Sequence, residues 1–452
     1  MAERIRCLGV QNRPEIVGLA VFFVSAVFFS TFLLTAPDSF MEKSCSDCAG
    51  WYYPVAENLA DERGLVIGDT DQPALDRPPG QVLLLSVVFR IGQIVGIEKV
   101  TMVYGYNVLL LSLAAYLLFL SSHLFWGIKG GLISAGLWSS SPFTFWFLNQ
   151  PFSEVPFFVF LFSSIWFLFQ SGCHKVNLKG LFLVGILLGM ATMIRPIGFA
   201  LVLPYLITFW AMRKRSLRKQ LFVGSIAIIS GVSAILTPWH VYLYDQKGSF
   251  VFLSDGVHMH RSIVEGFIFG IQSEEYKVEI PLAPDVKRFM EGMYKTIYRY
   301  DQDPAEMKTY GPGAPLDVGE TKNVITIAAR RLSEDLILAA RFLWLKISRS
   351  WYGTDSHRNE SAALLLQVFY LILCGLGLIR SLQLPHTRNL ALIAALTTLY
   401  FWSFSVTFTP LVRYMIPALG VLFLVAPGVF SSLAKARVTE WQQTRGQVSN
   451  HD

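Results

Sequence analysis

Long apolar runs alternate with short polar segments along most of the chain. Each run reaches or approaches the roughly 20 residues that an α-helix needs to cross a bilayer. The pattern therefore predicts an all-α polytopic membrane protein with about ten transmembrane helices. The predicted spans are residues 16–35, 100–122, 130–148, 155–171, 180–195, 197–212, 221–243, 361–380, 389–407 and 413–431.

Two further apolar stretches carry charges at helical spacing. Arg90 interrupts residues 81–97, and three basic residues interrupt residues 336–351. Charges placed in this way suit helices that lie in the membrane interface better than helices that span it. We therefore expect both stretches to form interfacial helices.

Basic residues in the short loops predict the orientation of the spans. With a cytoplasmic N-terminus, most of these residues, including the run RKRSLRK at 213–219, fall on the cytoplasmic side. If residues 81–97 also crossed the bilayer, this bias would largely reverse. We expect both termini to be cytoplasmic and two long segments, residues 37–99 and 244–360, to lie outside.

Composition supports the membrane class and limits the others. Hydrophobic residues make up 53% of the chain and charged residues only 15%, and the mean hydropathy is +0.45. The net charge of +6 does not indicate nucleic-acid binding, because the basic residues lie in loops between spans. We expect one membrane domain over residues 1–452, with two long segments outside the membrane.

The first outer loop contains the unusual segment SCSDCAGWYYPVAENLADERG, residues 44–64. Cys45 and Cys48 would lie in a compartment that permits disulfides, so a structural clip or two free thiols is favoured over a redox pair. The residues after Cys48 predict a short amphipathic helix that ends near Gly64. Asp47 stands just ahead of this helix, and Arg77 follows it in DRPPG.

Other charges lie at the outer junctions of the spans. Glu154, Arg195 and Arg413 each occupy such a place, and His240 leaves the membrane in TPWHVYLYDQKGSFVFLSDG. Charges this close to hydrocarbon are costly and are functional candidates by default. Each arginine could instead reach lipid phosphates, and Glu154 could complement a helix dipole. Opposite charges converging from separate spans favour a shared site.

These segments resemble bacterial members of the GT-C glycosyltransferases, which include protein O-mannosyltransferases and aminoarabinose transferases. The resemblance extends from about residue 10 to 430 and rests on the order and common side of its motifs. It implies a monosaccharide donor carried on a polyprenyl phosphate, a lipid, glycan or protein acceptor in the cell envelope, and an inverting transfer on the outer face. It also implies a place in the inner membrane of a bacterium, with the second outer segment, residues 244–360, capping the acceptor side. The motifs are an acidic residue before YYPVAENL, RPPG, SE at an outer junction, GILLGMATMIRP, TPWHVYLYDQKGSFVFLSDG and RYMIPALGVLFL.

The first of these motifs departs from the family's usual spacing. Members of the family usually place an Asp four residues before the helix Tyr, and counting back from Tyr52 gives Cys48, with Asp47 one residue earlier. Either the loop brings Asp47 into place by a small shift, or Glu57 or Asp61 replaces it. The chain could also be a membrane assembly subunit with a vestigial site.

The resemblance implies definite roles for the charged residues. Asp47 would be the catalytic base, and Glu154 would orient the acceptor or share that role. Arg77 would bind the lipid phosphate with Arg413 and Arg195, because a guanidinium group matches phosphate oxygens and stays charged.

Aromatic and histidine residues complete the predicted substrate-binding set. Tyr52 is expected to stack on the sugar or lipid head, and His240 and Asp255 are assigned to the substrate-binding surface. No cofactor is certain, and a divalent metal near His258 and His260 is an open alternative to solvated histidines.

A second class of function is a lipid or glycan transporter or flippase without catalysis. Such a protein is expected to have charges in mid-span and broken helices at the bilayer midplane. Here the charges gather at the outer junctions and the spans are nearly uncharged, which favours the enzyme.

Overall fold

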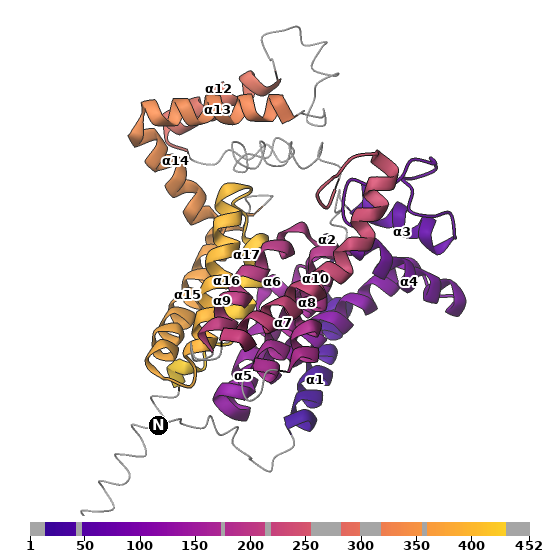
Figure 1. Cartoon of the computed structure of the whole chain (residues 1–452), viewed down its shortest axis with the longest axis vertical. Helices are drawn as coiled ribbons and strands as arrows, with labels where there is room; N and C mark the ends of the chain where they lie inside the picture. The colour runs from indigo at the N-terminus through magenta and orange to yellow at the C-terminus, as the bar shows by residue number, and fades with distance from the viewer. Residues whose placement is uncertain are drawn as a thin grey trace, which may run out of the picture.

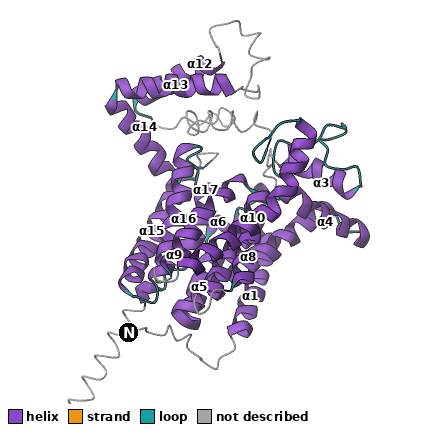
Figure 2. Cartoon of the chain, viewed as in Figure 1, coloured by secondary structure: helices purple, strands orange, loops and turns teal. Residues whose placement is uncertain are grey.

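The computed structural model describes residues 14–41, 48–172, 177–212, 218–254, 282–298, 318–354 and 359–430. These residues form a bundle of helices joined by loops and turns, without a strand (Figure 1, Figure 2). An isolated bridge between Val66 and Pro73 is the β-pairing recorded for this part of the chain. The predicted all-α class is confirmed.

The helices of the bundle follow the predicted spans closely. They are α1 (Pro14–Thr35), α5 (Lys99–Ser140), α7 (Glu154–Gly172), α8 (Leu178–Ile194), α9 (Val202–Ala211), α10 (Arg218–Lys247), α15 (Glu360–Gln383), α16 (Arg388–Thr407) and α17 (Val412–Phe423). The remaining elements are α2 (Asp38–Met41), η1 (Cys48–Tyr52), α3 (Tyr53–Ala60), α4 (Gly80–Val95), α6 (Pro142–Phe145), η2 (Pro196–Leu201), α12 (Pro284–Tyr298), α13 (Val318–Glu334) and α14 (Leu336–Arg349).

Seven helices of the described residues are long and apolar enough to cross a bilayer. The 42-residue α5 covers two predicted spans, because the non-helical φ of 68° at Gly127 divides it. Shorter apolar helices, α8 and the η2–α9 pair, stand where two more spans are predicted. Each predicted span therefore falls on a helix, and the count of ten crossings stays a prediction.

The predicted span 130–148 extends too far. Helix α5 ends at Ser140, because Ser141 and Pro142 open a turn. The Thr144 hydroxyl donates to the carbonyl of Trp138 at 3.0 Å, which satisfies a carbonyl freed by the helix end.

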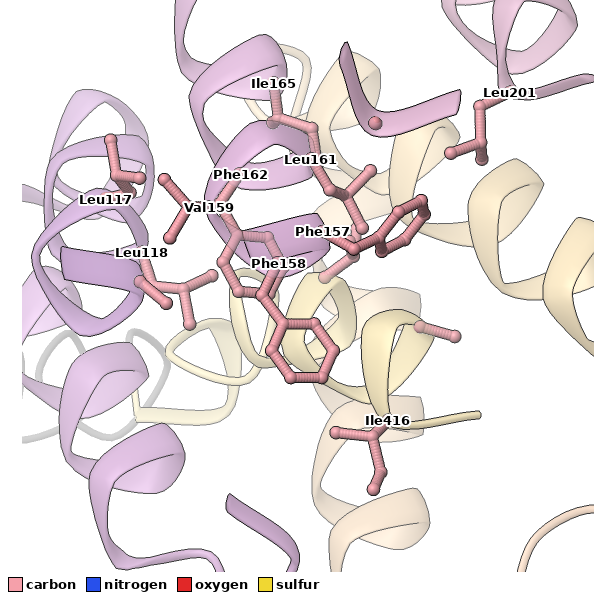
Figure 3. Close-up of a cluster of buried hydrophobic side chains, with 14 of the residues drawn as sticks. Leu117, Leu118, Phe157, Phe158, Val159, Leu161, Phe162, Ile165, Leu201 and Ile416 are labelled. Carbon is pink, nitrogen blue, oxygen red and sulfur yellow. The ribbon is translucent and has the colours of Figure 1, made fainter. Parts of the chain in front are cut away.

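Helix α7 lies at the centre of the bundle and α1 at its edge. Of the apolar window in α7, 72% is buried, against 17% in α1, so α1 presents most of its apolar surface to the surroundings. In a bilayer that surface contacts lipid tails, and packing rather than water exclusion holds the helices together. Figure 3 shows the α7 residues Phe157, Phe158, Val159, Leu161, Phe162 and Ile165 among Leu117 and Leu118 of α5, Leu201 of η2 and Ile416 of α17.

Helices α8 and α10 approach each other at small residues. A Cβ atom on Gly185 would lie 2.0 Å from the carbonyl oxygen of Ile228, and one on Gly231 would lie 2.2 Å from that of Phe182. Only glycine permits this separation of the two backbones, which fixes the helix that leads to Arg195.

The junctions with candidate charges gather at one end of the bundle. Because successive helices alternate in direction, this end carries α2 to α4, the α6 turn, the start of η2, α12 to α14 and residues 408–411 (Figure 1). We call it the loop-rich end. Helices α12 to α14 lie beyond the bundle there and share a small apolar core that includes Phe289, Met293 and Phe342.

Candidate active site

Three charged residues from separate junctions meet at the loop-rich end. The carboxylate of Glu154, at the start of α7, pairs with Nη1 of Arg195 and, at 3.1 Å, with Nε of Arg413. The Glu154 side chain is 2% exposed, whereas those of Arg195 and Arg413 are 14% and 22% exposed. The carboxylate is thus enclosed, and the guanidinium groups reach toward solvent. We call these three residues the arginine cluster.

The arginine cluster has more positive than negative charge. One carboxylate serves two guanidinium groups, and the ring of Tyr414 lies 5.4 Å from each of them. Both guanidinium groups are partly exposed, and the planar fork of arginine matches phosphate. Oε1 of Glu154 accepts from both arginines and Oε2 accepts from the Ser153 hydroxyl at 3.4 Å. The carboxylate therefore has little capacity left to take a proton from an acceptor hydroxyl.

Buried amides fix the irregular backbone that leads into Glu154. Nε2 of Gln81 donates to the carbonyl of Pro151 at 2.8 Å, and Nδ2 of Asn107 donates to that of Gln150 at 2.7 Å. Both side chains are 0% exposed. Non-helical backbone near membrane depth needs such donors, so these amides set the position of Glu154. The sequence analysis missed both residues.

The turn that follows Arg77 packs on the same end. A Cβ atom on Gly80 would lie 2.6 Å from the carbonyl oxygen of Met193, two residues before Arg195. The neighbouring Gln81 reaches the loop before Glu154 by its hydrogen bond. The segments of Arg77, Arg195 and Glu154 are therefore joined at one end of the bundle and do not lie on separate faces.

Arg77 rests on two aromatic rings of the first loop. Its guanidinium carbon lies 5.7 Å from the ring of Trp51 and 5.5 Å from that of Tyr52, and its Nη1 donates to the Tyr52 hydroxyl at 3.5 Å. Tyr52 is 7% exposed, which favours a role in holding Arg77 over open stacking on a sugar.

The helix predicted after the cysteines is present, but it ends earlier than expected. Helix α3 stops at Ala60 rather than near Gly64, because Nδ2 of Asn58 donates to the carbonyls of Val66 and Gly68 and folds the chain back. Cys48, the first residue of η1, is disulfide-bonded, which favours a structural clip over free thiols.

Two predicted site residues, Asp47 and Asp255, lie outside the described residues, as do His258 and His260. No group of three or more His, Cys, Asp or Glu side chains that could hold a metal occurs within the described ranges.

The two alternatives to Asp47 are engaged elsewhere. Glu57 pairs with Lys99 at 2.8 Å, and Asp61 accepts from Nε2 of Gln93 at 2.8 Å. Glu57 also lines a pocket of about 450 Å³ formed by α3 and the α4–α5 connection, to which no residue of the arginine cluster contributes. These contacts do not join Glu57 or Asp61 to the arginine cluster, and the role of Asp47 stays a prediction.

His240 has partners within its own segment. Its Nδ1 lies 3.0 Å from the carbonyl oxygen of Leu236, and its ring stacks on Phe250 at 5.6 Å. These contacts support a packing role near the helix end, and a substrate contact stays a prediction.

Comparisons with known proteins bear on the family and the fold. Residues 76–242, which include Arg77, Glu154, Arg195 and His240, match the family model for dolichyl-phosphate-mannose-protein mannosyltransferase. No curated protein sequence matches the chain.

Solved structures match the whole bundle. The apo oligosaccharyltransferase of Archaeoglobus fulgidus aligns with a TM-score of 0.53 at 14% identity over 94% of this chain and 52% of that one. The same enzyme with an inhibitory peptide and a dolichol-phosphate aligns with a TM-score of 0.51 at 14% identity, over 94% of this chain and 52% of that one. This chain spans about half the length of these structures. The family match and the shared architecture together make the chain a membrane protein of the GT-C glycosyltransferase fold, as its motifs predicted.

Proposed function

We propose that this protein transfers a monosaccharide from a polyprenyl phosphate to a lipid, glycan or protein acceptor of the cell envelope. The observation that carries the proposal is the arginine cluster: two arginines from distant junctions gathered on one enclosed carboxylate. The structurally similar archaeal enzyme has been solved with a dolichol-phosphate, a ligand of the same chemical class. We place the site on the outer face of a bacterial inner membrane, with both termini in the cytoplasm.

The arginines act on the leaving group. Arg413 and Arg195 bind the phosphate, and Arg77, held by Tyr52, approaches it from the first loop. As the bond from the anomeric carbon to the phosphate oxygen breaks, that oxygen takes the bonding electrons, and the guanidinium groups stabilise the growing charge. The lipid phosphate then leaves.

The acceptor hydroxyl supplies the new bond. Its oxygen attacks the anomeric carbon from the side opposite the phosphate, so a single displacement inverts the configuration. We assign Asp47 as the base that takes the hydroxyl proton. Glu154 holds the two arginines in place, which departs from the predicted sharing of the base role.

The second outer segment covers the acceptor side. Helices α12 to α14 lie beyond the loop-rich end with a core of their own (Figure 1), so they can select an acceptor without altering the bundle. His240 and Asp255 are candidates for contacts with that acceptor. A divalent metal beside Asp47 would lower the pKa of a bound hydroxyl, and no step here depends on one.

Transfer assays in membranes test the proposal. Asp47→Asn should lower transfer from a polyprenyl-phosphate sugar by about 100-fold or more, since a positioned base contributes roughly 10²–10⁴-fold. Arg77→Ala should lower it through weaker donor binding. Full activity in both variants would remove the mechanism, whereas retained lipid movement by a chain that never transfers sugar would favour a transporter.

A further inference from the structure

Helix α14 points two basic residues into the protein. Lys346 and Arg349 are 2% and 1% exposed, although the sequence pattern predicted charges lying in the membrane interface. Burial of a charge is costly unless the charge has partners of good geometry. Lys346 contacts the segment that leads to Arg413, and Arg349 contacts the start of α15.

Lys346 is bound to the end of α16. Its Nζ donates to the carbonyls of Thr407 and Phe408, at 3.3 Å each. These carbonyls belong to a helix C-terminus, where backbone acceptors lack helical partners and a positive group is favoured. Residues 408–411 then lead directly into α17 and Arg413.

Arg349 links the end of α14 to the start of α15. Its Nη1 and Nη2 donate to the two carboxylate oxygens of Glu360 at 2.8 and 2.5 Å. The same carboxylate accepts from the backbone N–H of Thr354 at 3.1 Å. A bidentate pair of this kind fixes both orientation and distance.

Gly353, just after α14, rests on the backbone beside Arg413. The N–H of Val412 donates to the carbonyl of Gly353 at 2.9 Å. A Cβ atom on Gly353 would lie 2.6 Å from the carbonyl oxygen of Pro410. The backbone at Gly353 therefore contacts the backbone at Pro410 directly, with no side chain between them. Val412 immediately precedes Arg413.

We propose that Lys346, Arg349 and Glu360 are positioning residues for Arg413. Together they hold residues 407–412 so that the Arg413 guanidinium stays on Glu154 and faces the donor phosphate. This inference rests on the phosphate-binding role proposed for Arg413. Helix α14 then has two roles, because its N-terminal half also contributes to the apolar core shared with α12 and α13.

Binding of a short-chain polyprenyl phosphate to the detergent-solubilised full chain tests the inference. Lys346→Met and Glu360→Gln should each raise the dissociation constant about tenfold, which corresponds to ~1.4 kcal/mol. Lys346→Met replaces a buried amine by an apolar side chain of similar shape, so it keeps the test available if Glu360→Gln does not fold. The matched control is Arg341→Ala, which breaks the 2.8 Å pair of α14 with Asp285 on α12 and should leave binding unchanged.

A double-mutant cycle separates positioning from general weakening of the fold. In an Arg413→Ala background, Lys346→Met and Glu360→Gln should have no further effect on binding, because they act through the missing guanidinium. Equal effects in both backgrounds would overturn the inference. If Arg413→Ala weakens binding while both other variants bind like the wild type, the inference alone fails. Wild-type binding by Arg413→Ala would remove the proposed phosphate role and the inference with it.

Discussion

Two buried arginine–carboxylate sites stand at the loop-rich end, and they differ in how many arginines each carboxylate serves. Glu360 binds one arginine through both oxygens and one backbone N–H. Glu154 binds two arginines from different helices. The first site has equal numbers of charges, and the second has one positive charge more.

The arginines of the two sites also differ in solvent exposure. Arg349 is 1% exposed, whereas Arg195 and Arg413 are 14% and 22% exposed. An enclosed, bidentate pair fixes geometry, whereas two partly exposed arginines at a solvent-facing edge can bind a further anion. Similar chemistry thus serves structure at one site and, we propose, the donor phosphate at the other.

The largest effect is expected from a substitution in the arginine cluster. Arg413→Ala should lower the transfer rate by about 10²–10³-fold, the usual cost of removing a donor aimed at developing charge. Arg413→Lys keeps the charge but loses the fork, so it should recover only part of the rate. Initial rates with a saturating donor measure this, and a loss below threefold for the alanine variant would argue against transition-state stabilisation by Arg413.

The structural site should respond in stability. Glu360→Gln leaves the buried Arg349 guanidinium without its charged partner, so it should lower the free energy of unfolding by about 3 kcal/mol. Thermal unfolding in detergent measures the change. The matched control is Glu334→Gln, which removes an exposed i,i+4 partner of Arg330 and should cost less than about 0.5 kcal/mol. Similar losses in both would mean that the enclosure of Arg349 does not matter.

The backbone support of Glu154 should give a smaller effect. Gln81→Leu removes the donor to the carbonyl of Pro151 and leaves a buried acceptor unsatisfied, at a cost of about 1–3 kcal/mol. Because the loop then holds Glu154 in a less fixed position, we expect the transfer rate of the folded variant to fall as well as its stability. Gln93→Leu, which removes a hydrogen bond to the exposed Asp61, is the control and should leave transfer unchanged.

A pH dependence of stability is also expected. Lys346 lies in α14, outside the candidate spans, and burial lowers its pKa from 10.5 to about 7. The unfolded chain keeps this proton up to its ordinary pKa, so the cost of burying the charge is fully present below pH 7 and declines as pH rises toward 10.5. The melting temperature of the wild type should therefore rise relative to that of Lys346→Met between these pH values. Parallel curves for the two proteins would contradict this.

Local patterns were sufficient to predict the spans and the junction charges. Apolar runs of membrane length have one main structural outcome, and the alternation of spans brings Glu154, Arg195 and Arg413 to one side without knowledge of their contacts. The resemblance through RPPG and RYMIPALGVLFL added the fold, which the structural comparisons share. The role of Asp47 stays a prediction.

Contacts between distant segments could not be predicted in this way. Charges on an amphipathic helix have the same spacing whether they face water or a buried carbonyl, so Lys346 and Arg349 were assigned to the interface. Their partners at Thr407 and Glu360 depend on how α14 docks. The roles of Gln81 and Asn107 could not be predicted for the same reason. The sequence does not show which carbonyl a single amide in an apolar run will bind, because that depends on the position of a distant loop.

Binding of polyprenyl phosphate to a charge-free arginine cluster tests the central claim most directly. The triple variant Glu154→Gln, Arg195→Gln and Arg413→Gln removes every charge of the cluster and leaves none buried without a partner. We predict a dissociation constant about 100-fold above that of the wild type, since two charge-assisted hydrogen bonds contribute roughly 1.5–3 kcal/mol each, with a melting temperature close to the wild-type value. Binding within twofold of the wild type by a folded triple variant would contradict a phosphate site at these arginines.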